Sequence, residues 1–174
     1  MNKLFFGAAA IFALAATPAL AQSNTAMTTA NSSITVYQPI SITNATDLAF
    51  GRVVRPSTGT GPGSVTIANN GTRTSAGGVI GLSSTTSAAG FTVTGEGASL
   101  VAISIPATFQ LMNGVIPLTV TTTNDLATPA STALSGSLGG TGTKSFNVGG
   151  SVPITDTTAS GAYTGSFTVT ATYN

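Results

Sequence analysis

The sequence predicts an all-β protein, an immunoglobulin-like antiparallel β-sandwich, and three observations carry that prediction. After residue 22 apolar and polar residues alternate, whereas the spacing of an amphipathic helix is nearly absent. About ten short alternating segments follow one another at near-regular spacing, as they do in sandwich domains. Asn-Gly and Gly-Gly turn signals separate them, at residues 69–71, 113–114 and 139–140.

The first 21 residues have the pattern of a signal peptide. A short basic start at Lys3 precedes an apolar run over residues 4–16, and residues 19–21 form a small-x-small cleavage site. No cysteine follows that site, so a lipoprotein is not expected. We therefore expect a bacterial protein that is exported, passing through the periplasm to the cell surface or the medium.

Cleavage after residue 21 leaves about 153 residues (174 − 21), the size of one domain. Residues 22–33 form a small, polar lead-in, and residues 34–174 are predicted to form a single sandwich domain. No segment of this mature chain is long and apolar enough to cross a membrane as a helix.

The first predicted strand covers residues 34–43, where apolar side chains alternate with Thr and Ser. Its apolar face consists of Ile34, Val36, Ile40 and Ile42. Pro39 has no N–H to donate, so the segment is an edge strand or two strands with a kink. The next predicted strand covers residues 47–54, with Gly51 as a bulge.

The middle of the chain contains further short strands and two long loops. The strands are predicted over residues 64–68, 78–83, 91–95, 100–105, 108–112, 116–122, 144–148 and 152–154. Residues 56–63 are rich in Gly, Pro and Thr, which is typical of a loop. Residues 126–143 are the least regular part of the chain and are predicted to form a long surface loop.

The last predicted strand, residues 162–173, has the strictest alternation in the chain. Its apolar face consists of Tyr163, Gly165, Phe167, Val169, Ala171 and Tyr173, and the opposite face is Thr or Ser throughout. Such a strand has one buried and one wet face, and its register is firmly fixed. An uncovered strand edge is a template for pairing, so Tyr163, Phe167, Val169 and Tyr173 are the candidate docking edge.

Composition argues against an enzyme. The chain has no His or Cys, which removes the usual catalytic triads, thiol nucleophiles and zinc ligands, and no cofactor or metal is expected. Only nine of 174 residues are charged, too few for a nucleic-acid surface. Without Lys3 the positive and negative residues balance at four each, and a net charge near zero favours association.

Three motifs occur in order along the chain: residues 48–51 (LAFG), 91–95 (FTVTG) and 161–173 (GAYTGSFTVTATY). Together they resemble the secreted bacterial "domain of unknown function 4402" family. The first and last motifs are also similar to the spore coat U family and the archaic chaperone–usher pilins. Those pilins often have a disulfide near the first strand, which this cysteine-free chain cannot form.

The pilin resemblance implies a sandwich that lacks one strand. A periplasmic chaperone first lends that strand, and the N-terminal segment of the next subunit then replaces it, which is β-augmentation in physical terms. On this resemblance Ile34, Val36, Ile40 and Ile42 are the candidate donor strand. The alternative, left open by the sequence, is that these residues form the first strand of a complete sandwich.

The resulting functional hypothesis is a non-enzymatic structural protein of the cell surface, a pilin-like fibre or coat subunit assembling by strand exchange. Its expected partners are copies of itself, a periplasmic chaperone or a surface assembly partner. The alternative is a monomeric surface module that binds carbohydrate or another cell. Sugar-binding faces usually need exposed Trp or Tyr, and this chain has no Trp and three Tyr.

Overall fold

The computed structural model describes residues 24–174, so the predicted signal peptide lies outside the described residues. The chain divides into two units, one ending at Thr35 and one spanning Val36–Asn174. In the first unit, residues 24–35 have no helix or strand and every side chain is exposed. We call residues 24–36 the tail and residues 37–174 the domain.

The domain is all-β, and residues 24–174 contain no helix. Its strands are β1 (Ser41–Thr46), β2 (Val53–Val54), β3 (Gly63–Ile67), β4 (Arg73–Ala76), β5 (Ile80–Gly81), β6 (Ala89–Glu96), β7 (Leu100–Ser104), β8 (Thr108–Asn113), β9 (Ile116–Asn124), β10 (Thr132–Ala133), β11 (Thr141–Ile154) and β12 (Thr170–Tyr173).

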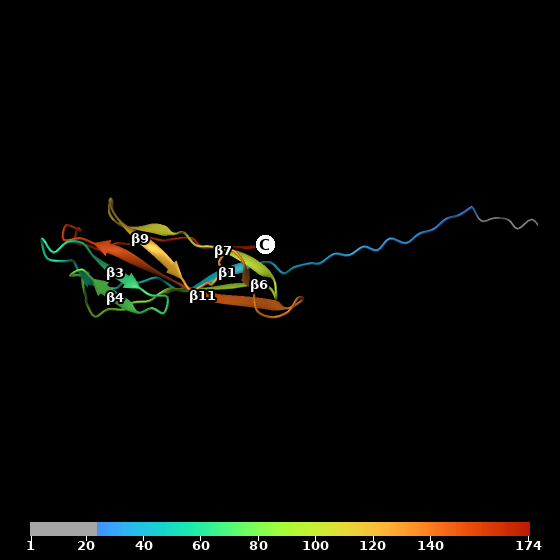
Figure 1. The fold of residues 1–174 in the computed structure, drawn as a ribbon, viewed down its shortest axis with the longest axis horizontal. Helices are drawn as coiled ribbons and strands as arrows, with labels where there is room; N and C mark the ends of the chain where they lie inside the picture. Colours follow the sequence, from blue (N-terminus) through green and yellow to red (C-terminus); the bar gives the residue numbers. More distant parts are fainter. Residues whose placement is uncertain (1–23) are drawn as a thin grey trace, which may run out of the picture. The chain divides into compact units, whose positions relative to one another are not determined.

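These strands form antiparallel sheets (Figure 1). The large sheet has the order β1-β6-β11-β3-β4, and β9 joins it through β11 and carries β8. A small sheet has the order β10-β7-β12, and β2 pairs with β5. The predicted all-β sandwich is thereby confirmed.

The 14-residue strand β11 runs through both halves of the domain. Its first part, from Thr141 to Val148, pairs with β6, and its second part pairs with β3 and β9. The sequence predicted two strands here, separated at Gly149 and Gly150, and placed the start of β11 in a loop. Gly149 and Gly150 instead lie inside one continuous strand. The neighbouring strand passes so close that a side chain at Gly149 would collide with the backbone oxygen of Ile67.

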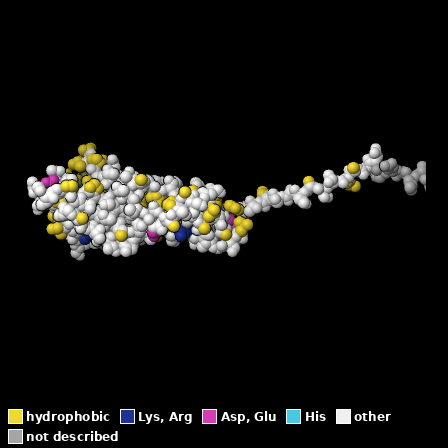
Figure 2. Space-filling model, in the orientation of Figure 1, with side chains coloured by type: hydrophobic (Ala, Val, Ile, Leu, Met, Phe, Trp, Pro, Cys, Tyr) yellow, Lys and Arg dark blue, Asp and Glu magenta, His cyan; other side chains and the backbone are white. Residues whose placement is uncertain are grey.

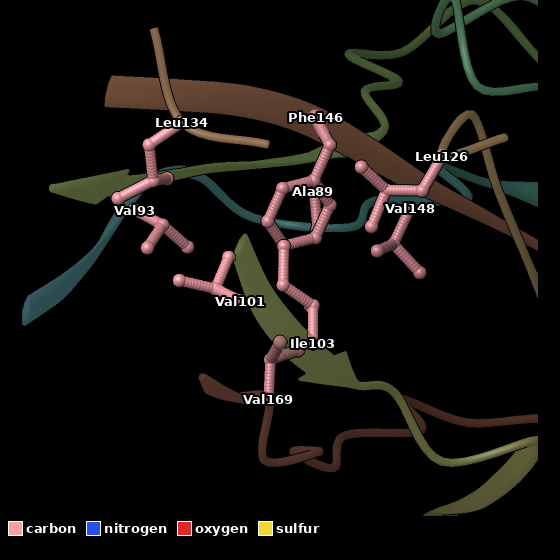
Figure 3. Close-up of a cluster of buried hydrophobic side chains, with 9 residues drawn as sticks. All are labelled: Ala89, Val93, Val101, Ile103, Leu126, Leu134, Phe146, Val148 and Val169. Carbon is pink, nitrogen blue, oxygen red and sulfur yellow. The ribbon is translucent and has the colours of Figure 1, made fainter. Parts of the chain in front are cut away.

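A closed hydrophobic core lies between the first half of the large sheet and the small sheet (Figure 3). This first core consists of Ala89, Val93, Val101, Ile103, Leu126, Leu134, Phe146, Val148 and Val169. Phe91 and Phe167 pack at its margin, with ring centroids 5.9 Å apart.

The second core lies in the other half, between the end of β11 and the β8–β9 hairpin. It consists of Val65, Val79, Val120, Val152 and Ile154. The half-buried residues around it are Phe50, Val53, Phe109, Leu111 and Leu118. With five buried residues, this core is smaller than the first.

The last strand is shorter than predicted. Only Thr170–Tyr173 forms a ladder, with β7, although the predicted alternation of buried and exposed residues extends back to Tyr163 except at Gly165, which is exposed. The upstream residues are extended but have almost no pairing partner, and a strand needs a partner as well as a pattern. The first predicted strand is also displaced, since its ladder begins at Ser41, beyond Pro39.

Candidate functional site

An open apolar groove adjoins the second core. Residues 48–55 and residues 158–165 form its two sides, which we call wall 1 and wall 2. Its floor consists of Val65, Leu111, Leu118, Val152 and Ile154. The cavity has a volume of about 980 Å³, at the upper end of the range for sites that bind small molecules. It can therefore take several side chains.

Wall 1 is held from behind by β5 and by the guanidinium group of Arg73. Val53 pairs with Gly81 across the short β2–β5 ladder. Arg73 donates from Nη1 to the carbonyl oxygen of Phe50 at 3.2 Å and from Nη2 to that of Leu82 at 2.6 Å. Because Arg73 itself is not among the residues that line the groove, these bonds support wall 1 without filling it.

Wall 2 is paired at a single residue. Within residues 159–169 the only β-bridge joins Thr164 to Met112 of β8, with N···O distances of 2.7 and 3.0 Å. Both backbone groups of Thr164 are used on that side. In an antiparallel pair the neighbouring residues point the other way, so the N–H and C=O groups of Tyr163 and Gly165, which also line the groove, point away from β8.

One end of the groove is closed by a bond between the two walls. Arg55 of wall 1 donates from Nη1 to the carbonyl oxygen of Thr158, which begins wall 2, at 2.7 Å. Beside it, the N–H of Gly59 donates to Asp156 Oδ2 at 3.0 Å. Walls 1 and 2 are thus joined at this end.

The N-terminal segment joins the domain at the other end of β11. Three residues hold it there, Gln38, Glu96 and Tyr173, and we call this cluster the exit clamp because the tail leaves the domain at this point. The N–H of Gln38 donates to Glu96 Oε2 at 3.1 Å, and the hydroxyl of Tyr173 donates to the Gln38 carbonyl oxygen at 2.8 Å. The Glu96 N–H donates to that same hydroxyl at 2.6 Å. Both backbone groups of Gln38 are therefore fixed.

The structure separates the four residues of the predicted donor strand into two pairs. Ile34 and Val36 are 87% and 77% exposed. Ile40 and Ile42 instead pack against the first core of their own domain, where Ile42 faces Val93. In this structure only Ile34 and Val36 are accessible to another molecule.

The four residues of the predicted docking edge also lie in different places. Tyr163 is in wall 2, and its hydroxyl donates to the carbonyl oxygen of Ala159 at 3.0 Å. Val169 is part of the first core and Phe167 packs against it. Tyr173 belongs to the exit clamp. Only Tyr163 borders the groove.

Sequence reasoning missed the floor and the polar groups that shape the site. Leu111 and Leu118 were placed in strands, but alternation alone does not say which strands enclose an open core. Arg73 and Glu96 carried no signal, because a single charged residue in a polar stretch usually faces solvent. Glu96 is in fact only 1% exposed.

No group of three metal-binding side chains occurs among the residues that the structure describes. A search of the same residues for a membrane-spanning helix finds no candidate.

Fold and site together define an all-β sandwich with an apolar groove beside a wall whose only β-bridge, within residues 159–169, is at Thr164. The chain belongs to the family DUF4402, a domain of unknown function, whose model matches residues 40–173. No curated protein and no solved structure matches the chain.

Proposed function

We propose that this protein is a non-enzymatic structural subunit, exported to the cell surface, that assembles by strand addition as a pilin-like fibre or coat subunit. The observation that carries this proposal is the groove: an apolar floor beside a wall whose backbone is paired at Thr164 alone. An incoming strand could use both features at once.

Strand addition suits this geometry for two physical reasons. Backbone groups of an added strand can bond to the free groups of Tyr163 and Gly165, and alternate side chains can enter the apolar floor. Burying one large aliphatic side chain contributes about 1.5–3 kcal/mol before ordering costs. Two such side chains give about 3–6 kcal/mol, which offsets part of the cost of association, and backbone pairing has to supply the rest.

The partners of this proposal are copies of the same chain and, before assembly, a periplasmic chaperone. An uncovered strand edge beside an apolar floor invites wrong pairing during folding. A protein that covers the groove until subunits meet would prevent it. The chaperone is proposed by analogy with the pilins, which the motifs at residues 48–51 and 161–173 resemble.

The experiment compares an unboiled with a boiled sample of the native host's surface extract on a denaturing gel, probed for this protein. We expect a ladder at multiples of the mature mass that collapses to a monomer band on boiling. A single monomer band in both lanes contradicts the proposal and favours a monomeric binding module.

A matched pair of variants connects the ladder to the groove. Leu118→Arg puts a charge on the floor, whereas Thr119→Arg puts the same charge on the exposed side of the same strand. Only Leu118→Arg should abolish the ladder. Circular dichroism of both purified variants checks that each remains folded, and equal ladders in both would contradict strand addition at this groove.

A further inference from the structure

The chain contains two Asn-Gly pairs, and each lies in a turn between paired strands. Asn70-Gly71 connects β3 with β4, and Asn113-Gly114 lies at the turn of the β8–β9 hairpin. In such a pair the backbone nitrogen of the glycine can attack the asparagine carboxamide with little obstruction, because glycine has no Cβ. The two pairs are locally alike, so the fold decides which of them can react.

The backbone nitrogen of Gly114 is free to react. Asn113 pairs with Ile116, so Gly114 and Val115 form a two-residue turn. Gly114 has a φ of +60° and Val115 has none above zero, which is the pattern of a type II′ turn. The bond of that turn joins its first and fourth residues, and no turn or loop bond within residues 24–174 is donated by Gly114. Figure 2 shows apolar side chains gathered at this turn, where Val115 is 90% exposed.

The backbone nitrogen of Gly71 is bonded instead. Its N–H donates to the carbonyl oxygen of Ala68 at 2.8 Å. The carboxamide of Asn70 is engaged as well, because its Oδ1 accepts the N–H of Thr72 at 3.0 Å. Both groups that would have to meet are therefore held by other partners.

We propose that Asn113 is a site of spontaneous deamidation, whereas the fold protects Asn70. The nitrogen of Gly114 loses its proton and forms a bond to Asn113 Cγ, and the bond from Cγ to Nδ2 breaks. The released nitrogen takes up a proton and leaves as ammonia. Water then opens the cyclic imide at one of its two carbonyl groups and leaves an aspartate or an isoaspartate linkage. The step needs no oxidant and no reactant other than water.

Asn113 lies against wall 2, so its conversion changes the site. Its Nδ2 donates to the carbonyl oxygen of Ser160 at 3.4 Å, and its side chain fills the space that a Cβ at Gly161 would need. The preceding residue, Met112, makes the β-bridge to Thr164. A carboxylate has acceptors only, so after deamidation two acceptors face each other at Ser160. Wall 2 thereby loses a contact beside its β-bridge.

The first test uses the unaltered protein. It is kept in a mildly alkaline buffer, and peptide mapping by mass spectrometry follows deamidation at each asparagine over time. Because one hydrogen bond lowers the availability of the Gly71 nitrogen, Asn113 should convert about fivefold faster than Asn70 in the folded protein. Equal rates, or a faster reaction at Asn70, overturn the proposal.

The control for this test is the same measurement in urea. Unfolding exposes both glycine nitrogens to water, so the rates at Asn113 and Asn70 should converge. A difference that persists at full size in urea would belong to the local sequence and would overturn the assignment to the fold.

The second test measures the effect on wall 2 in the monomer. Asn113→Asp reproduces one product of the reaction, and Asn70→Asp is the matched control. Hydrogen exchange at the Thr164 amide, which is bonded to Met112, should be about fivefold faster in Asn113→Asp and unchanged in Asn70→Asp. Circular dichroism checks that both variants are folded, and unchanged exchange in Asn113→Asp overturns the effect on wall 2.

This inference is independent of the proposed function. Both of its tests are read on the monomer, so their failure leaves strand addition at the groove as it stands. Conversely, a monomer band alone on the denaturing gel contradicts the proposed function and leaves the reaction at Asn113 untouched.

Discussion

The two halves of the domain share strand β11 but differ in how completely their cores are covered. In the first half the small sheet covers the core, and Val93, Val101 and Val148 have no exposed surface. In the second half the comparable position is occupied by wall 2, whose only β-bridge to the neighbouring sheet is at Thr164. The valines of the second core are buried as well, but they adjoin half-buried side chains such as Leu111 and Leu118 that border the groove, so one strand supports two cores with different margins.

This difference separates the residues that stabilise the monomer from those expected to bind another strand. Well-covered apolar side chains stabilise the monomer, whereas half-buried side chains of the groove such as Leu111 and Leu118 stabilise it less and gain burial only when something covers them. We therefore expect stability to depend on the first core and assembly to depend on the groove.

The largest expected effect is in the first core. Phe146→Ala removes a buried ring that stacks on Phe91, with centroids 5.5 Å apart, and should destabilise the monomer by about 3–5 kcal/mol. Leu118→Ala, on the half-buried floor, should cost about 1 kcal/mol. Urea denaturation at low protein concentration measures both. Equal losses would mean that the two cores are equally closed.

Next in size is the support of wall 1. Arg73→Met removes the guanidinium bonds to the carbonyl oxygens of Phe50, Arg52 and Leu82 and should cost about 2–3 kcal/mol. The same change should weaken assembly, because the wall is no longer held in place. Denaturation and the gel ladder measure the two effects, and an unchanged ladder would mean that wall 1 is not part of the joint.

A smaller effect is expected at the exit clamp. Tyr173→Phe keeps the ring that lies edge-on to Tyr37 but removes the hydroxyl that bonds Gln38 and Glu96. The expected cost is about 1–2 kcal/mol, with faster hydrogen exchange at the Glu96 amide, which loses its acceptor. If that amide exchanges at the same rate in both proteins, the hydroxyl does not hold the clamp together.

The smallest effect is expected on the wet face of the C-terminal segment. Ser166→Val changes an exposed side chain beside the half-buried Phe167 and should alter stability by less than about 0.5 kcal/mol. Phe167→Val should cost several times more. Thermal unfolding compares them, and a reversed order would mean that the two faces have been assigned the wrong way round.

Alternation predicted which side chains of the C-terminal segment are buried, since Tyr163, Phe167 and Val169 are covered and the residues between them are exposed. It did not predict that most of the segment lacks a ladder. The pattern reports which face meets the core, whereas pairing depends on which strands arrive beside it, and that is a property of the whole fold.

The predicted donor strand shows the same limit at the other end of the chain. Its four apolar residues share one face by spacing, yet Ile40 and Ile42 cover their own core while Ile34 and Val36 stay exposed. Pro39 indicated a kink between the two pairs of residues. The local sequence did not indicate that Glu96 and Tyr173, far along the chain, hold Gln38 in place just before that proline.

Hydrogen exchange at wall 2 tests the central claim most directly. The amides of Tyr163 and Gly165 point away from β8, whereas the Thr164 amide is bonded to Met112 and serves as the internal reference. We predict fast exchange at Tyr163 and Gly165 in the monomer and strong protection of both in the assembled protein. Equal protection of these two amides in the monomer and in the assembly would contradict the account.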